Sequence, residues 1–185
     1  MTSFLKAILF LIGSGGIAWF SRKSLCAPRA HGFYRFFAWE CLLALFLWNA
    51  EWWFVDPFSW HQMVAWLLLA VSAFLALHGI YLLRIAGKPD DQRAETPLIG
   101  IEKRTQLVTV GAYKYIRHPL YSSLLFLGAG IFFKHPFWLA GGCLAATTVF
   151  LVMTAWVEEA ENCRFFGAAY REYMKGTKIF VPFLF

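Results

Sequence analysis

The chain is organised around the stretch Leu107-Val-Thr-Val-Gly-Ala-Tyr-Lys-Tyr-Ile-Arg-His-Pro-Leu-Tyr121, which is aromatic, cationic and polar. It opens with a short β-prone piece and a glycine, and it leads directly into an apolar run, residues 120–133, that is typical of a membrane segment. A cationic segment at a membrane surface is costly unless it binds something. We therefore expect a partner at the far end of the following hairpin, where Glu158 and Glu159 stand.

The composition indicates a membrane protein. Of 185 residues, 59% are hydrophobic, 19% are aromatic and 15% are charged, whereas a soluble domain has about 25% charged residues. We predict one membrane domain over residues 1–185 that is all-α, with about five transmembrane helices and a C-terminal cytoplasmic helical segment. The net charge of +6 does not indicate a nucleic-acid partner, because the basic residues lie in loops between apolar runs, where membrane topology explains them.

The four cysteines indicate neither a metal site nor a disulfide framework. No two of them form a CxxC pair, and Cys41 and Cys143 lie inside apolar runs, as small buried hydrophobic residues do.

Five apolar stretches cover residues 4–20, 36–55, 62–83, 120–133 and 137–157. A helix needs about 20 residues to cross a bilayer, so the fourth is short and either begins near Pro119 or forms a tight hairpin with the fifth. Residues 1–83 then hold three spans, and residues 84–185 form a cofactor-binding part made of a loop, a two-span hairpin and a C-terminal helix. The first stretch resembles a signal peptide, but only Lys6 precedes its core and no A-x-A site follows.

The loop charges indicate the orientation. With five spans and the N-terminus outside, 15 of the 17 lysines and arginines lie on the cytoplasmic side, and only Lys6 and Lys134 lie outside. If the last two stretches dip into the bilayer without crossing, only Lys134 changes sides. The small size and the lack of a targeting segment favour a bacterial inner membrane.

A polar loop over residues 88–104 and the C-terminal segment flank the central stretch on the same side. We expect the last span to continue as a helix to about Phe165, a second helix to hold residues 168–174, and an apolar tail to lie back on the membrane. Tyr170 and Tyr173 then share one helical face.

The candidate site combines carboxylates, aromatic rings and cations on the predicted cytoplasmic side. Its members are Tyr113, Arg117, His118, Tyr121, Glu158, Glu159, Tyr170 and Tyr173. Carboxylates suit an amine or ribose hydroxyls, aromatic faces suit a purine or a positive centre, and Arg117 and His118 suit a carboxylate or phosphate. The alternatives are that His118 caps the fourth span, that the glutamates are solvated, and that the two tyrosines of the C-terminal helix are interfacial anchors.

Three spaced motifs follow each other in order: Gly111-x-Tyr113-x-x-x-Arg117-His118-Pro119-x-Tyr121, then Glu158-Glu159, then Phe166-Gly167-x-x-Tyr170-x-x-Tyr173 with a late Val-Pro. In these motifs the chain resembles the isoprenylcysteine carboxyl methyltransferase and phospholipid methyltransferase superfamily of integral membrane enzymes, over about residues 105–182. The resemblance implies S-adenosylmethionine as methyl donor and no metal. Carried over by position, the cofactor residues are Thr105, Gln106, Leu107, Val108, Tyr113, His118, Pro119, Leu120, Tyr121, Glu158 and Glu159.

Two positions depart from the family pattern. Family members often have a histidine where this chain has Thr105. In the prenylcysteine enzymes an arginine one turn before the first glutamate holds the substrate's carboxylate, and this chain has Thr154 there. A threonine does not replace a bidentate arginine, which argues against a prenylated cysteine as acceptor unless Arg35 or Arg164 supplies the cation.

Methyl transfer from a sulfonium requires the acceptor atom about 3–3.5 Å from the methyl carbon and in line with the breaking bond. An amine or thiol acceptor also needs a base, and His78 and Glu40, near the inner ends of their spans, are the candidates; with Arg117 they are the predicted catalytic residues. We predict a methyltransferase that uses S-adenosylmethionine on a lipid-like or small hydrophobic acceptor, at an oxygen, nitrogen or sulfur atom. The alternatives are an NADPH-dependent membrane reductase of the sterol reductase type, which ends in a similar Arg-His-Pro pattern, and a non-enzymatic membrane protein on the same scaffold.

Overall fold

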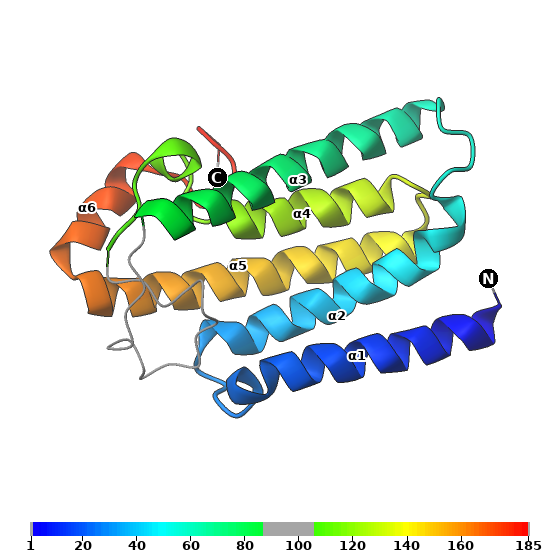
Figure 1. Cartoon of the computed structure of the whole chain (residues 1–185), viewed down its shortest axis with the longest axis horizontal. Coiled ribbons are helices and arrows are strands. Elements are labelled where there is room, and N and C mark those ends of the chain that lie inside the picture. The colour runs from blue at the N-terminus through cyan, green and yellow to red at the C-terminus, as the bar shows by residue number, and fades with distance from the viewer. Residues whose placement is uncertain (1, 87–105, 185) are drawn as a thin grey trace.

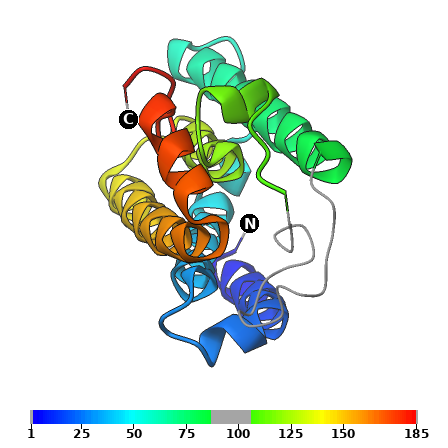
Figure 2. The same cartoon turned by 90° about the vertical axis from the view of Figure 1, so that its left-hand side faces the viewer.

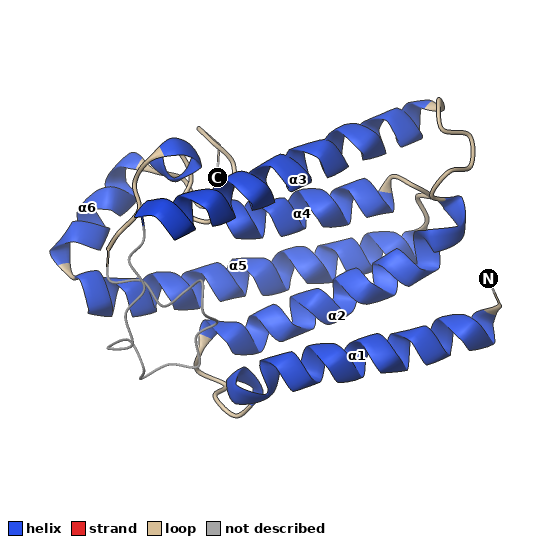
Figure 3. Ribbon diagram, viewed as in Figure 1, coloured by secondary structure: helices blue, strands red, loops and turns tan. Residues whose placement is uncertain are grey.

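The computed structural model describes residues 2–86 and 106–184, and every regular element within these ranges is a helix (Figures 1 and 3). The elements are α1 (Ser3–Leu25), α2 (His31–Asn49), η1 (Ala50–Trp52), α3 (Trp60–Ala86), η2 (Gly111–Lys114), α4 (Pro119–Phe132), α5 (Trp138–Phe166) and α6 (Ala168–Gly176). The predicted all-α class is therefore confirmed. The β-prone residues before Gly111 form no strand; one isolated bridge joins Ile116 to Lys178 instead.

The five longer helices lie side by side, with α1 on α2, α2 on α5 and α3 on α4 (Figure 1). The hairpin of α4 and α5 stands in the middle. One end of the bundle, which we call the pocket end, holds α6, η2 and the short segment between η2 and α4 (Figure 2). At the other, the turn end, lie η1 and the turn between α4 and α5.

Three helices, α1, α3 and α5, are long and apolar enough to cross a membrane. Large apolar side chains on their outer faces fit a lipid environment; Leu11 is 70% exposed and Leu77 71%. The protein is thus an integral membrane protein. α4 has 14 residues, about 21 Å at 1.5 Å per residue, and α2 carries Arg35 and Glu40, so the count of five spans stays a prediction.

Helix α2 ends at Asn49, six residues before the end of the apolar stretch that we expected to be helical. The reason lies in contacts from distant parts of the chain. The carbonyl of Trp52 accepts a hydrogen bond from Gln62 Nε2 at 2.7 Å, and the carbonyl of Trp53 accepts one from Lys134 Nζ at 3.3 Å. These carbonyls therefore serve α3 and the α4–α5 turn instead of a longer α2.

Helix α5 continues to Phe166, which confirms the expected extension beyond the apolar stretch. It ends at Gly167, whose φ of 61° and ψ of −128° lie in a region that is essentially restricted to glycine. The chain turns there and forms α6, in agreement with the predicted second helix.

The C-terminal tail is fixed against α4 and α5. Phe180 is buried in an apolar cluster with Tyr121, Leu151 and Ala155. Backbone hydrogen bonds run from Arg117 N to the carbonyl of Lys178 at 2.7 Å and from His118 N to the carbonyl of Ile179 at 3.1 Å. These contacts hold the Arg-His-Pro segment in place, and α4 begins directly after it, with Pro119 as its first residue.

Candidate functional site

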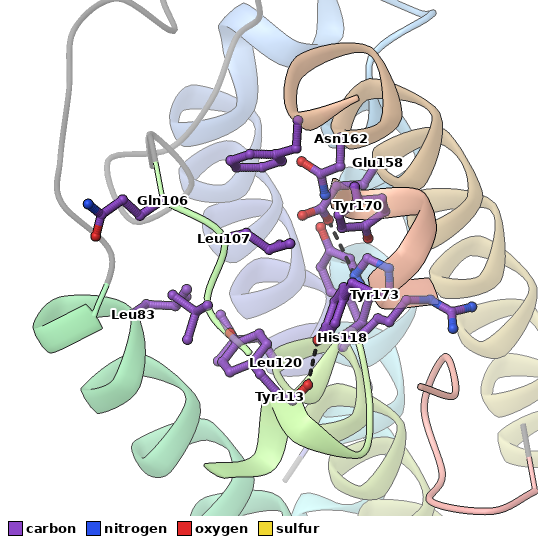
Figure 4. Close-up of a pocket in the computed structure, with 14 residues that line it drawn as sticks. Leu83, Gln106, Leu107, Tyr113, His118, Leu120, Glu158, Asn162, Tyr170 and Tyr173 are labelled. Atoms are coloured by element: carbon purple, nitrogen blue, oxygen red, sulfur yellow. Dashed lines mark hydrogen bonds and ion pairs between the residues drawn. The ribbon is translucent and has the colours of Figure 1, made fainter. Parts of the chain in front are cut away.

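A pocket opens at the pocket end between residues 106–121, the last turns of α5 and α6 (Figure 4). The space between these segments is about 700 Å³, part of it open to solvent. Its lining residues are Leu83, Gln106, Leu107, Val108, Tyr113, Arg117, His118, Leu120, Tyr121, Glu158, Asn162, Phe166, Tyr170 and Tyr173.

Most of the predicted cofactor residues lie around this pocket. Those that line it are Gln106, Leu107, Val108, Tyr113, His118, Leu120, Tyr121 and Glu158. Pro119 and Glu159 are not among the lining residues, and Thr105 lies outside the described residues. The structure thus brings together segments that are about 40 residues apart in the sequence, and the binding role of each residue stays a prediction.

Arg117 has the carboxylate partner that the sequence predicted. Its Nε donates to Glu159 Oε1 at 2.6 Å, and both side chains are largely buried. Its Nη1 donates to the carbonyls of Met174, at 3.3 Å, and Thr177. Arg117 therefore ties the end of α6 to α5, and this arrangement supports a positioning role for the residue that we predicted to be catalytic.

His118 lies between the two glutamates. It is 5% exposed; its Nδ1 is 3.7 Å from Glu158 Oε2, and its Nε2 is 3.4 Å from Glu159 Oε1. Its ring stacks on Tyr121 with the centroids 5.3 Å apart. His118 is the N-cap residue of α4, as the alternative interpretation expected, but its side chain makes no capping hydrogen bond and faces the glutamates.

An aromatic wall stands opposite, on α5 and α6. Tyr173 Oη donates to the carbonyl of Tyr113 at 2.6 Å, and the rings of Tyr170 and Phe166 stack with their centroids 6.3 Å apart. Tyr170 is 2% exposed, so it is a wall residue and not an interfacial anchor. Burial raises the pKa of both tyrosine hydroxyls, which keeps them neutral at physiological pH.

The two predicted bases do not reach this pocket. His78 stacks on Phe74 with the centroids 5.4 Å apart, and its Nε2 is 2.8 Å from the position that a Cβ at Gly111 would take. Glu40 has a buried Oε1 without a hydrogen-bond partner among the described residues. Neither lines the pocket, so the structure does not support their assignment as bases, and their roles remain predictions.

Sequence reasoning missed Leu83, Asn162 and Phe166 as pocket residues. A signal for two of them was present, because Glu158, Asn162 and Phe166 are spaced four residues apart on one helix and share a face. Leu83 carries no such signal. Within residues 2–86 and 106–184, no three histidine, cysteine or acidic side chains come together as a metal site.

Comparisons with known proteins agree with the motifs. The chain is 25% identical to methanethiol S-methyltransferase from Crocosphaera subtropica over 124 residues, which cover 65% of this chain and 44% of that protein. It is 29% identical to methanethiol S-methyltransferase from Pseudomonas deceptionensis over 123 residues, 65% of this chain and 43% of that protein. This chain is similar to membrane methyltransferases.

These two similarities confirm the resemblance to isoprenylcysteine carboxyl methyltransferase-like enzymes. The matched part spans less than half the length of either relative. No family model matches the chain, and no solved structure matches it.

Proposed function

We propose that this protein transfers a methyl group from S-adenosylmethionine to a small or lipid-like hydrophobic acceptor. One observation carries the proposal: a carboxylate, a histidine and an aromatic wall surround one pocket at the end of an apolar bundle in a chain similar to two methyltransferases. Because both relatives are named for methanethiol, a small thiol is the first acceptor to test.

The lining residues suit the parts of this cofactor. Glu158 offers a carboxylate to an amine or to ribose hydroxyls. The rings of Phe166, Tyr170 and Tyr173 offer faces to adenine and to the sulfonium. When bound, S-adenosylmethionine supplies an activated methyl group, so the work of the protein is to position the acceptor and exclude water. The apolar side chains of Leu83, Leu107 and Leu120 line the pocket for that purpose.

A thiol acceptor must lose its proton before or during transfer. Of the chain's five histidines, only His118 lines the pocket, and the imidazole is the side chain best suited to take a proton near neutral pH. Its ring nitrogens face the carboxylates of Glu158 and Glu159, at 3.7 and 3.4 Å, which orient the ring in the pocket. We therefore assign the base to His118 in preference to His78 and Glu40.

Isothermal titration calorimetry on the purified protein in detergent tests the cofactor. S-adenosylmethionine and its demethylated product should bind, and Glu158→Gln should weaken both by about tenfold to a hundredfold, the loss expected for a hydrogen bond to a charged group. Glu172→Gln is the matched control, because Glu172 is exposed and pairs with Lys175 away from the pocket. Binding of NADPH alone would favour a reductase, and binding of none of the three would favour a non-enzymatic protein.

A comparison of acceptors tests the substrate class. Labelled methyl transfer to methanethiol should exceed transfer to a prenylated cysteine, because Thr154 replaces the arginine of the prenylcysteine enzymes. Thr154 is fully buried and donates to the carbonyl of Phe150 at 2.7 Å, so Thr154→Arg would overpack the bundle. Efficient methylation of the prenylated cysteine by the wild type would overturn the argument from Thr154.

We also propose that the pocket end faces the cytoplasm of a bacterial inner membrane. Cys26 offers a test, because it follows α1 at this end and is the one exposed cysteine of the four. A membrane-impermeant maleimide should label Cys26 in inverted vesicles and not in intact spheroplasts. Labelling in spheroplasts alone would reverse the assigned orientation.

A further inference from the structure

Two recesses adjoin the C-terminal tail on a face that the proposed function does not use. The first is an apolar groove over α4, which is shorter than its neighbours α3 and α5. Its lining residues are Leu68, Ser122, Leu125, Phe126, Ala129, Leu144, Thr148, Phe180 and Val181. These residues come from α3, α4, α5 and the C-terminal tail.

The second recess lies beyond the tail at the pocket end and is basic. Arg117, Lys175 and Lys178 line it, together with Thr177, Ile179 and Leu184. No carboxylate is among its lining residues in the described chain. Lys178 forms no ion pair with a described residue, and Lys175 pairs only with the exposed Glu172, a surface contact of little strength.

The two recesses meet at consecutive residues of the tail. Ile179 lines the basic recess, while Phe180 and Val181 line the apolar groove. Phe183 and Leu184, 84% and 79% exposed, continue the tail, as apolar residues at a membrane interface do. A ligand with an anionic head and an apolar chain fits these two adjoining recesses. Its chain would lie in the groove along α4, and its head would lie beside the lysines of the basic recess.

We propose that these recesses bind one anionic phospholipid of the surrounding membrane. Its phosphate would contact Lys178 and Lys175, and one acyl chain would lie in the groove over α4. The usual excess of basic residues on one side of a membrane explains exposed lysines, but it does not explain an apolar groove that ends beside them. The proposal does not depend on methyl transfer. The basic recess adjoins the candidate cofactor pocket at Arg117, which lines both.

Native mass spectrometry of the detergent-purified protein, titrated with phosphatidylglycerol or phosphatidylcholine, tests this site. We expect one phosphatidylglycerol to bind more tightly than phosphatidylcholine. Removal of one charge in Lys178→Gln should weaken phosphatidylglycerol binding about fivefold, and Lys175→Gln with Lys178→Gln about 25-fold. Lys23→Gln, an exposed lysine in the last turn of α1, is the matched control and should leave binding unchanged.

A second pair of variants tests the acyl groove. Ala129→Phe fills the groove and should weaken binding of both lipids, whereas Ala73→Phe, an exposed position on α3, should not. Equal binding of the two lipids, or equal losses in Lys178→Gln and Lys23→Gln, would overturn the proposal of an anionic site. Unchanged binding in Ala129→Phe would overturn the placement of the chain.

Discussion

Lys134 at the turn end and Arg117 at the pocket end are two cations with opposite surroundings. At the turn end, Lys134 is 0% exposed, its Nζ is 3.2 Å from the centre of the Trp66 ring, and it donates to Gln62 Oε1 at 2.9 Å. Burial lowers the pKa of Lys134, while the ring face stabilises its charged form. At the pocket end, Arg117 pairs with the carboxylate of Glu159 beside an open pocket.

At the turn end, side-chain contacts join the turn after α2 to the turn between α4 and α5. Gln62 bonds the carbonyls of Trp52 and Lys134, at 2.7 and 3.2 Å, and His135 stacks on Trp52 with the centroids 4.1 Å apart. None of these residues around Lys134 lines the pocket at the opposite end. A buried charge alone therefore does not mark a functional site; paired ionised groups next to a cavity do.

The largest expected effect is that of Arg117→Ala. This change leaves the carboxylate of Glu159 buried without its partner and frees the carbonyls of Met174 and Thr177. The free energy of unfolding should fall by about 3–5 kcal/mol, as when a buried ion pair loses one member. Denaturant unfolding in detergent micelles measures it.

Two further variants make the test of this pair specific. Adding Glu159→Gln should recover part of the loss, since it removes the uncompensated charge. Arg171→Ala, an exposed arginine on α6, is the control and should cost little. An equal cost for the two arginine variants would show that the pair with Glu159 does not stabilise the pocket end.

The next largest effect is that of Lys134→Met, which keeps the apolar stem and removes the charge. Gln62 Oε1 and the carbonyl of Trp53 then lose a buried donor, and we expect a loss of about 2–3 kcal/mol in the free energy of unfolding. Affinity for S-adenosylmethionine should not change, because Lys134 lies at the end opposite the pocket. A parallel loss of cofactor affinity would contradict the separation of the two ends.

The sequence predicted the helices well because each long apolar run is a local signal. It also predicted that Glu158 and Glu159 are partners of the stretch Leu107–Tyr121, because the loop charges place all of these residues on one side of the membrane, and Arg117 does pair with Glu159. It did not predict the contacts of Lys134 at the turn end. Lys134 was expected to be a loop charge, because its partners Gln62 and Trp66 are about 70 residues away in the sequence. The end of α2 depends on the same contacts.

The two candidate bases do not line the pocket for a related reason. Depth along a span can be estimated from the sequence, and this is how His78 and Glu40 were selected. Depth does not tell which face of a helix meets the pocket, and neither residue lines it. The spacing of Glu158, Asn162 and Phe166 does carry that information, because residues four apart share a face.

A smaller effect is expected for Gly111→Ala at the entrance of η2. Gly111 has a φ of 58°, and a Cβ there would stand 2.6 Å from Leu82 Cδ1 and 2.8 Å from His78 Nε2. The strain and the contacts should cost about 1–2 kcal/mol of unfolding free energy and loosen the pocket wall on its α3 side. Gly142→Ala is the control, because it lies in α5 with no atom within 4 Å of the new Cβ, and it should be neutral or stabilising. Equal changes in unfolding free energy in the two variants would show that position 111 does not require glycine.

The smallest effect is that of Tyr173→Phe, and it separates the chemistry of the pocket wall from its packing. The variant keeps the ring and removes the hydroxyl that donates to the carbonyl of Tyr113 at 2.6 Å, so unfolding free energy should fall by about 1 kcal/mol. Tyr81→Phe, on an exposed face of α3, is the control. Because burial raises the pKa of the Tyr173 hydroxyl, this group stays protonated, and the difference between variant and wild type should be constant from pH 6 to pH 9. A difference in unfolding free energy that grows or disappears within that range would mean that another ionisable group determines the strength of this hydrogen bond. A constant difference would show that the Tyr173 hydroxyl stabilises the pocket wall as a neutral donor, a contribution that a bound cofactor can add to.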